Sequence, residues 1–528
     1  MKNTFLTSVV YLILLYSGIS FGGNKKPEVQ TTSNPSPENA KVEMSSDLKF
    51  VSLSLKDSII YALRNNFDIE ISKLSSKSSN YDITVEKARF DPMLKLTGTK
   101  QDSEVPSSNV LQTGTTVITP FVSQGHTADA VLQSLMPTGA TVSLEYNMFR
   151  SFLNPSPFQL INPSYTNFIQ AQVTQPLLKG AGWFYNRSPI YIARNNKKIS
   201  LAQFKITAIE VSNSVQEAYW NLIKAIEDLK VAKKSKERAE DLLKKNKIQV
   251  ETGTLAPLDV VDAEAGVASR VEAVITAENA IKDKEDELKR VMNMADNEII
   301  SDAAIMPTDK PIFESKKVEL KDAIKVAMEN RPELHGLQLQ VENAGMQTRR
   351  RKNELFPQLD FTGGVLYTGL GKEVSAANDS VFSEQFQGEF LGLTLSIPIG
   401  NRSARSQYSK AKIAEQQANT NIKKMELDVV VEAREAVRAV MTNIERVNAT
   451  RKARELAQKR LEVEEKKYRV GRSTSLEILR AQEDLATAEG NEAKAIIDYE
   501  ISLGNLEKAK GTILDAYDIK LEEEETKT

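Results

Sequence analysis

Leu391-Gly392-Leu393-Thr394-Leu395-Ser396-Ile397 places an apolar residue at every second position, with small or polar residues between them. Successive side chains of a β-strand point to opposite faces of a sheet, so this stretch predicts a strand with one apolar and one polar face. Such a strand suits a barrel that meets lipid on its outside and water on its inside. It equally suits a half-buried sheet in a water-soluble domain.

Three further segments show the same alternation. Their apolar positions are Leu94 and Leu96, then Ile169, Ala171 and Val173, then Leu359, Phe361 and Val365. The four predicted strands cover about 93–101, 166–177, 358–368 and 388–398. Each has roughly the 9 to 11 residues that a tilted strand needs to cross hydrocarbon. A sheet in lipid cannot keep an unpaired edge, and known membrane barrels begin at about eight strands. We therefore predict that several copies of the chain close one barrel together.

Two segments leave alternatives open. A fifth alternating stretch, Val142 to Met148, follows a turn-like Met136–Gly139, with a partner strand expected at about Ala128–Leu135. We favour an extracellular or rim extension for 128–150 over a third pair of barrel strands. The aromatic run Trp183-Phe184-Tyr185 fits equally an interfacial anchor or the packed start of a long helix.

The long helices have a distinctive period. Between 404 and 470, apolar residues recur at steps of three, four and four: Ala411, Ala414, Ala418, Ile422, Met425, Val429, Ala433, Ala436, Val440, Ile444 and Val447. This 11-residue repeat averages about 3.67 residues per turn, so the apolar stripe runs almost straight. Helices over about 188–250 and 404–470 would each be roughly 95 to 100 Å long. Such helices alone favour a soluble coiled-coil rod, but they leave no soluble core for the strands to cover.

The sequence contains an internal repeat. Leu55-Lys56-Asp57 recurs 265 residues later as Leu320-Lys321-Asp322, and Gly253 and Leu258 recur 218 residues later as Gly471 and Leu476. Such correspondences indicate a duplicated architecture. The predicted organisation is a first repeat over 47–295 with a helix-pair tip near 253–259, a linker or equatorial segment over 296–317, a second repeat over 318–515 with its tip near 471–477, and an acidic tail over 516–528.

The first residues carry a targeting signal. Lys2, an apolar run over Phe5–Tyr16 and a small-residue stretch ending at Gly23 predict a secretory signal peptide over 1–23, with an uncleaved anchor as the alternative. Residues 24–46 are rich in Ser, Pro, Thr, Asn and Glu and predict a disordered leader. The chain has no cysteine, which excludes disulfides, thiolate metal sites and a lipoprotein anchor.

Composition argues against enzymes and nucleic-acid binders. Lys and Arg (69) nearly balance Asp and Glu (71), so no general electrostatic attraction to nucleic acid is expected. The two histidines, His126 and His335, have no partner at metal-ligand spacing. The sequence contains no phosphate-binding Gly-Lys-Ser/Thr loop and no nucleophile elbow. We predict no catalytic residue, no cofactor and no metal site.

Several motifs occur in a telling order after the leader: Gln175-Pro176-Leu177, Asn330-Arg331-Pro332-Glu333-Leu334, Leu355-Phe356-Pro357-Gln358-Leu359, Ile397-Pro398-Ile399, and the two turns that begin at Thr252 and Tyr468. With them the chain resembles the TolC family of outer-membrane efflux proteins. The resemblance implies a mainly α fold with membrane β, in which a long-helix periplasmic α-barrel of 12 helices joins a trimeric 12-stranded outer-membrane β-barrel.

The resemblance also implies a function. The chain would be the outer-membrane channel, or exit duct, of a tripartite efflux or type I secretion system, located in the cell outer membrane and extending into the periplasm. The implied partners are two further copies in a homotrimer, outer-membrane lipid, a periplasmic adaptor (membrane fusion) protein and an inner-membrane pump. A periplasmic or secreted coiled-coil structural protein is the alternative. The small, polar lumen-facing positions fit drugs, metals or an unfolded protein equally well.

The resemblance places both turns at the inner tip of the tunnel, as a closable entrance that receives the adaptor. The implied entrance constriction consists of Asp259, Asp262, Tyr468, Arg472, Glu477 and Arg480, and the adaptor-docking tip of Gly253, Thr254, Leu255, Gly471, Arg472 and Ser473. The chain departs from the family pattern at Arg480, where an acidic residue is usual, and at Ser473, in place of an arginine.

Elementary geometry agrees with a chain reversal at these turns. Gly253 and Gly471 suit a helix end that needs a positive φ. Glu477 and Arg480 are three residues apart and share one helix face. We hypothesise that threefold copies of Asp259, Asp262 and Glu477 make the entrance attractive to cations.

Overall fold

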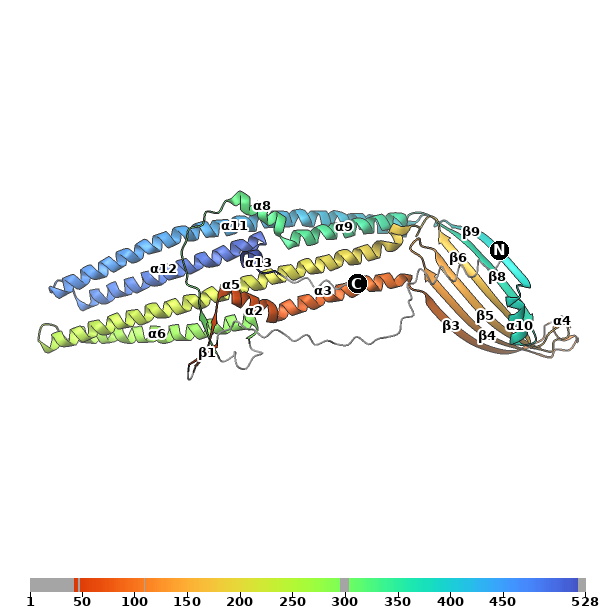
Figure 1. Cartoon of the computed structure of the whole chain (residues 1–528), viewed down its shortest axis with the longest axis horizontal. Helices are drawn as coiled ribbons and strands as arrows, with labels where there is room; N and C mark the ends of the chain where they lie inside the picture. Colours follow the sequence, from red (N-terminus) through yellow and green to blue (C-terminus); the bar gives the residue numbers. More distant parts are fainter. Residues whose placement is uncertain (1–41, 46–47, 109, 295–302, 521–528) are drawn as a thin grey trace. The chain divides into compact units, whose positions relative to one another are not determined.

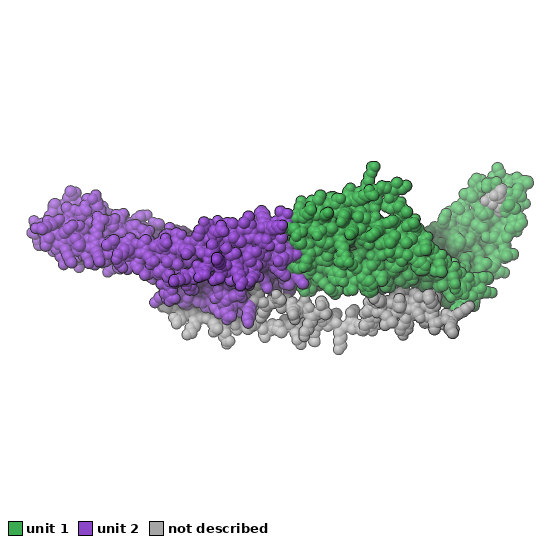
Figure 2. All heavy atoms as spheres, turned by 90° about the horizontal axis from the view of Figure 1, so that it is seen from above, with its two compact units in different colours: residues 1–30, 78–197, 339–419 green, residues 31–77, 198–338, 420–528 purple. Residues whose placement is uncertain are grey.

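The computed structural model describes residues 42–45, 48–108, 110–294 and 303–520. The signal peptide predicted over 1–23, most of the leader over 24–46 and the end of the acidic tail over 516–528 lie outside these residues. The chain divides into two compact units, coloured separately in Figure 2. Unit 1 contains Ser78–Lys197 and Leu339–Asn419, and unit 2 contains Lys198–Gln338, Thr420 onward and the described residues up to Lys77.

Unit 1 contains one antiparallel sheet of six strands in the order β3-β4-β5-β6-β8-β9 (Figure 1). The strands are β3 (Met93–Pro106), β4 (Pro120–Leu135), β5 (Thr141–Asn154), β6 (Ser164–Pro176), β8 (Gln358–Gly371) and β9 (Phe386–Ser396). Within the described chain, β3 and β9 each have one neighbouring strand, so they are the two edges of the sheet.

The strand register gathers the alternating apolar residues on one face. Leu94 pairs with Leu132, Leu132 with Leu144, Leu144 with Ala171, and Ala171 with Val365. Cross-strand partners point to the same side of a sheet, so these five residues form one apolar row. The side that carries this row is called the apolar face below, and the other side the polar face. On β9 the apolar face carries Leu391, Leu393 and Leu395, which are exposed in the single chain.

The rim extension that we favoured for 128–150 is wrong. β4 pairs with β3 from Pro120 to Gln133, and β5 pairs with β6 from Thr141 to Ser151, so the hairpin lies inside the sheet. A 12-stranded barrel built from three chains needs four strands per chain, whereas this sheet contains six. Alternation in the sequence identifies the two faces of a strand, but it does not reveal the neighbour with which the strand pairs.

Two short helices lie in the connections at one end of this sheet, α4 (Val110–Thr113) and α10 (Val374–Phe382) (Figure 1). α10 packs so closely on β8 that a Cβ added to Gly369 would clash with the carbonyl oxygen of Ala377. Asn378 of α10 accepts hydrogen bonds from the Tyr146 hydroxyl and the Asn167 amide, both at 2.6 Å. α10 therefore lies over the part of the apolar face that contains Tyr146, Asn167 and Gly369.

The helices of the two repeats match in length. The pairs are α2 (Leu55–Asn65) and α8 (Leu320–Asn330), α3 (Phe67–Lys87) and α9 (Pro332–Asn353), α5 (Trp183–Glu251) and α11 (Arg402–Arg469), and α6 (Pro257–Met292) and α12 (Ser475–Lys510). α5 and α11 have 69 and 68 residues, and α6 and α12 have 36 each. No helix in the described ranges is long and apolar enough to span a bilayer.

The aromatic run at 183–185 is the start of α5. The guanidinium of Arg349 lies 3.9 Å from the ring centre of Phe184, and that of Arg350 lies 5.2 Å from the ring of Tyr185, distances typical of cation–π contacts. Pro189 lies within the helix and has no N–H, and the Ser188 hydroxyl instead donates to the carbonyl of Tyr185 at 3.0 Å. Of the two interpretations, the packed helix start describes Phe184 and Tyr185.

Unit 2 contains a small sheet beside its helices, in the order β1 (Val42–Ser45), β2 (Leu48–Leu53) and β7 (Ala304–Pro307). β1 falls within the predicted disordered leader, and it is ordered because its backbone pairs with β2. β7 lies in the segment predicted as a linker over 296–317, of which 296–302 is outside the described residues. Tyr219 is fully buried under this sheet, and its hydroxyl lies 2.6 Å from Asp309 Oδ2.

Candidate functional site

The tips of the two helix hairpins in unit 2 share one backbone conformation. At the end of α5, Gly253 has φ +75°, its N–H donates to the Val250 carbonyl at 2.9 Å, and the Thr254 N–H donates to the Gln249 carbonyl at 2.9 Å. The same two hydrogen bonds recur 218 residues later at the end of α11, around Gly471 with φ +73°. This pair of bonds is the Schellman motif, which satisfies the last carbonyls of a helix and reverses the chain.

Gly253→Ala is expected to destabilise the first turn by about 1 to 2 kcal/mol, because an L-residue with a side chain is strained at this φ. The space around Gly253 is open, so no clash adds to the strain. The free energy of unfolding of the purified protein measures the effect. Gly490→Ala is the matched control, because Gly490 lies inside α12 and a methyl group added there would meet no neighbouring element within 4 Å. This control should stabilise the protein by up to ~1 kcal/mol, and equal effects of the two changes would contradict the assignment.

Tyr468 joins the two hairpins through a buried polar network. Its hydroxyl lies 2.7 Å from Oδ1 of Asn246, and the Asn246 amide donates to Ser475 Oγ at 2.6 Å and to the Asp259 carbonyl at 3.1 Å. Asn246 and Ser475 are 0% exposed. The network therefore connects the end of α5, the start of α6, the end of α11 and the start of α12. Burial, with a smaller contribution from the nearby Asp259 carboxylate, raises the pKa of Tyr468, so the hydroxyl keeps its proton.

Asn246 and Ser475 were not identified from the sequence. Asn246 lies four residues after the buried Leu242 and therefore on the inward face of α5. A single asparagine on an apolar helix face was the available signal, since a buried amide needs hydrogen-bond partners.

One of the three acidic side chains of the predicted constriction, Glu477, forms an ion pair. Arg480 Nη1 donates to Glu477 Oε1 at 2.9 Å, the pairing expected from their spacing, so Arg480 offsets the charge of Glu477. Asp259 and Asp262 are partly exposed, and among the described residues neither forms an ion pair. Asp259 and Asp262 are therefore the constriction acids without an ion-pair partner in the described chain, and the exposed Arg472 adds one positive charge nearby in the sequence.

The outer part of the second turn is fixed by polar contacts. The Ser473 hydroxyl donates to Glu464 Oε2 at 2.9 Å, and Lys467 Nζ lies 2.7 Å from Glu464 Oε1. The hydrogen bond from Lys467, followed by that from Ser473, lowers the pKa of Glu464. Thr474 caps α12 by accepting the Glu477 N–H at 3.4 Å. Ser473 thus holds the turn to α11, while Arg472 is exposed on the surface.

The tips also expose apolar side chains. Leu258 is 68% exposed and Val470 is 69% exposed, and Val261 and Leu476 are exposed beside them. Of the predicted docking residues, Gly253, Thr254 and Gly471 are exposed, while Leu255 and Ser473 are partly buried. The structure thus brings the predicted tip residues of each turn together with a rim of exposed apolar side chains.

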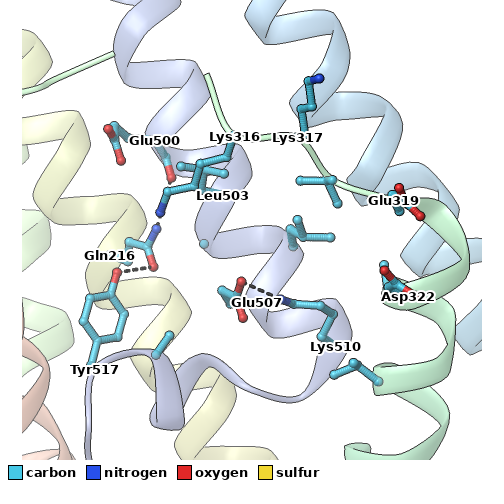
Figure 3. A pocket seen from close by; sticks show the side chains of 16 residues that line it. Gln216, Lys316, Lys317, Glu319, Asp322, Glu500, Leu503, Glu507, Lys510 and Tyr517 are labelled. Atoms are coloured by element: carbon cyan, nitrogen blue, oxygen red, sulfur yellow. Dashed lines mark hydrogen bonds and ion pairs between the residues drawn. The ribbon is translucent and has the colours of Figure 1, made fainter. Parts of the chain in front are cut away.

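A second candidate site is a pocket of about 460 Å³ in unit 2 (Figure 3). It is lined by α5, α8, α12 and the segment around Lys316, and both Glu500 and Tyr517 face it. The Tyr517 hydroxyl donates to Gln216 Oε1 at 3.1 Å. Burial raises the pKa of Glu500 to about 7, Lys316 opposes this shift, and Glu314 adds to it. Burial also raises the pKa of Tyr517.

Glu500 is expected to make stability depend on pH. The folded chain binds the Glu500 proton more tightly than the unfolded chain, so stability falls as the pH rises from about 4.5 through about 7. Glu500→Gln removes this loss and should stabilise the protein at pH 8 by about 1 to 2 kcal/mol, less than the full shift implies because the carboxyl is partly exposed.

Thermal midpoints measured at pH 5 and pH 8 test this expectation. Glu507→Gln is the control, because Glu507 lines the same pocket but pairs with Lys510 at 2.6 Å. An unchanged difference between the two pH values in Glu500→Gln would contradict the role of Glu500.

A sheet with one apolar face, joined in sequence to two long helical hairpins with matched tips, defines the class of outer-membrane channels built from strands and helices. The profile of the family described as "Outer membrane efflux protein" matches residues 59–294 and 323–512. The chain belongs to this family. The resemblance seen in the sequence, the mainly helical fold with a sheet portion and the outer-membrane location are thereby confirmed.

Individual relatives agree with this assignment. The chain is 26% identical over 302 residues to outer membrane protein TolC of Escherichia coli K12, a match that spans 56% of this chain and 60% of that protein. The CmeC outer membrane channel of Campylobacter jejuni superposes with a TM-score of 0.62 at 14% identity, covering 87% of this chain and 86% of CmeC. The open state of the MtrE outer membrane channel of Neisseria gonorrhoeae gives 0.60 at 17% identity, covering 93% and 98%.

Proposed function

We propose that this chain forms a passive exit duct of a tripartite efflux or type I secretion system, assembled from three copies. The observation that carries the proposal is the strand register, which forms a row of apolar residues from Leu94 to Val365 across five strands and places Leu391, Leu393 and Leu395 of β9 on the same face of a sheet with two open edges. In lipid, open edges must pair, because unpaired backbone groups have no water to bond. Copies of the chain supply that pairing.

The helical hairpins of unit 2 would form the wall of a periplasmic tunnel with the tips as its entrance. The network of Tyr468, Asn246 and Ser475 supports a closed entrance, because it ties the two hairpins of one copy together. Asp259 and Asp262 would line the constriction and favour cations. Opening then requires this buried network to break.

The tips would also receive a periplasmic adaptor protein, which connects the duct to an inner-membrane pump that supplies the energy. The exposed Leu258, Val261, Val470 and Leu476 support this role, because clustered exposed apolar side chains mark interaction sites. The turns themselves expose backbone and small residues at Gly253 and Gly471, where a partner can approach closely.

Fractionation and electrical recording test the duct. The protein should remain with outer membranes through carbonate washing, migrate as a heat-modifiable oligomer and form ion-conducting pores in planar bilayers. A periplasmic coiled-coil structural protein would instead wash off and leave the bilayer sealed. Release by carbonate together with an absence of pores would therefore overturn the proposal.

A further inference from the structure

The β4–β5 hairpin is an internal part of the six-stranded sheet. It pairs along its length with β3 on one side and with β6 on the other. A loop-like extension above the membrane would be attached at one end and would have free edges. Here both edges of the hairpin are occupied, so removing it would separate β3 from the rest of the sheet.

The side chains of the hairpin continue both faces of the sheet. On the apolar face, Ala130 and Tyr146 lie between Leu96 and Ile169 in one row. On the polar face, Asp129 and Asn147 are cross-strand partners and are joined by a hydrogen bond. From Thr141 to Met148 of β5, apolar residues occupy one face and polar residues the other, as in a strand between lipid and water, whereas on β4 Val131 interrupts the polar face.

A row of basic residues crosses the apolar face of the hairpin, and Phe152 is the next residue on that face of β5. Lys100, His126 and Arg150 are successive cross-strand partners, one step beyond the row of Gly98, Ala128 and Met148. From Val142 to Arg150 the strand advances about 27 Å at ~3.4 Å per residue, or roughly 20 Å of height at the tilt of membrane strands. This is close to the ~25 Å apolar band of outer-membrane barrels, and basic side chains suit the level of the lipid phosphates.

We propose that the hairpin is embedded in the outer membrane and widens the exit pore, so that three copies of six strands close a barrel of 18 strands. The assembly of three copies is taken from the proposed function. Because barrel diameter grows roughly linearly with strand number, this pore would be about 1.5 times as wide as one of 12 strands. Barrels of 16 to 18 strands leave an open aqueous channel. Size selection of cargo would then occur at the helical entrance, and polypeptide-sized hydrophilic cargo could leave through the membrane.

Single cysteines test the position of the hairpin, since the chain has none of its own. Spin labels at Leu132→Cys and, on the polar face, at Gln133→Cys would be compared in reconstituted membranes by their accessibility to oxygen and to a water-soluble nickel chelate. Leu132→Cys should report lipid and Gln133→Cys water. Water at both positions would overturn the inference. Leu393→Cys on β9 is the reference: if it also reports water, the proposed membrane duct itself fails.

Deletion of 120–154 tests the width. It leaves β3 and β6 free to pair as antiparallel neighbours, joined by the residues between 106 and 120 and between 154 and 164, in a four-stranded sheet. Exclusion of polyethylene glycols added on the outer side of single pores measures the diameter of the barrel rather than that of the entrance. The intact protein should admit polymers about 1.5 times wider than the deletion variant admits. An equal cut-off in the two proteins, both shown to form pores, would overturn the widening.

Discussion

Tyr468→Phe is expected to shift the entrance toward its open state by about 5- to 150-fold. The substitution removes the hydroxyl that lies 2.7 Å from Asn246 Oδ1 and leaves this fully buried oxygen without that donor. An unsatisfied buried acceptor costs about 1 to 3 kcal/mol, which corresponds to this range of equilibrium constants. The cost applies to the closed arrangement, because water reaches the groups once the hairpins separate. The open probability of single pores in planar bilayers measures the shift.

Two further variants make this test specific. Tyr517→Phe removes a hydroxyl of the same kind from the pocket around Gln216, and it should leave the open probability unchanged. Asn246→Ala should open the entrance as well, because it removes the link to Ser475 together with the acceptor of Tyr468. A double-mutant cycle between Tyr468 and Asn246 should give a coupling energy of about 0.5 to 3 kcal/mol. Additive effects would show that the two side chains do not act as one closing contact.

The long helices and the repeats could be predicted from the sequence because their signals are local. The apolar period over 404–470 predicts α11 to within a few residues, and Gly253 and Gly471 mark both chain reversals. The i,i+3 spacing of Glu477 and Arg480 likewise anticipates their ion pair. In each case the interacting atoms are separated by at most one or two helical turns, so the sequence pattern alone constrains them.

Features that depend on pairing between residues far apart in the chain could not be predicted from the sequence. The alternation of Val142 to Met148 predicted a strand with the correct apolar face, but whether the hairpin ends above the membrane or enters the sheet depends on β3 and β6. β4 gave a weak signal, because Ala128 and Ala130 contribute little apolar contrast against Val131 on the other face. Asn246 was missed for a similar reason: its partner Ser475 lies 229 residues away.

The second large effect concerns ion selectivity at the entrance. Neutralising Asp259 and Asp262 together by substitution with asparagine should lower the ratio of cation to anion permeability about tenfold, at the lower end of what focused charge contributes in narrow openings. The reason is that these aspartates are the constriction acids without an ion-pair partner among the residues that the structure describes, whereas Glu477 is offset by Arg480 at 2.9 Å. Asparagine keeps the size and polarity of each side chain. Reversal potentials of single pores in a salt gradient measure the ratio.

The ion pair supplies the control for this measurement. Replacing Glu477 and Arg480 together by glutamine removes two opposite charges from the same helix face and should change the permeability ratio little. Glu477→Gln alone should lower cation preference, because it leaves Arg480 uncompensated. At high ionic strength all of these differences should shrink, because the Debye length falls to about 3 Å at 1 M salt. An unchanged reversal potential in the double aspartate variant at low salt would remove Asp259 and Asp262 from the constriction.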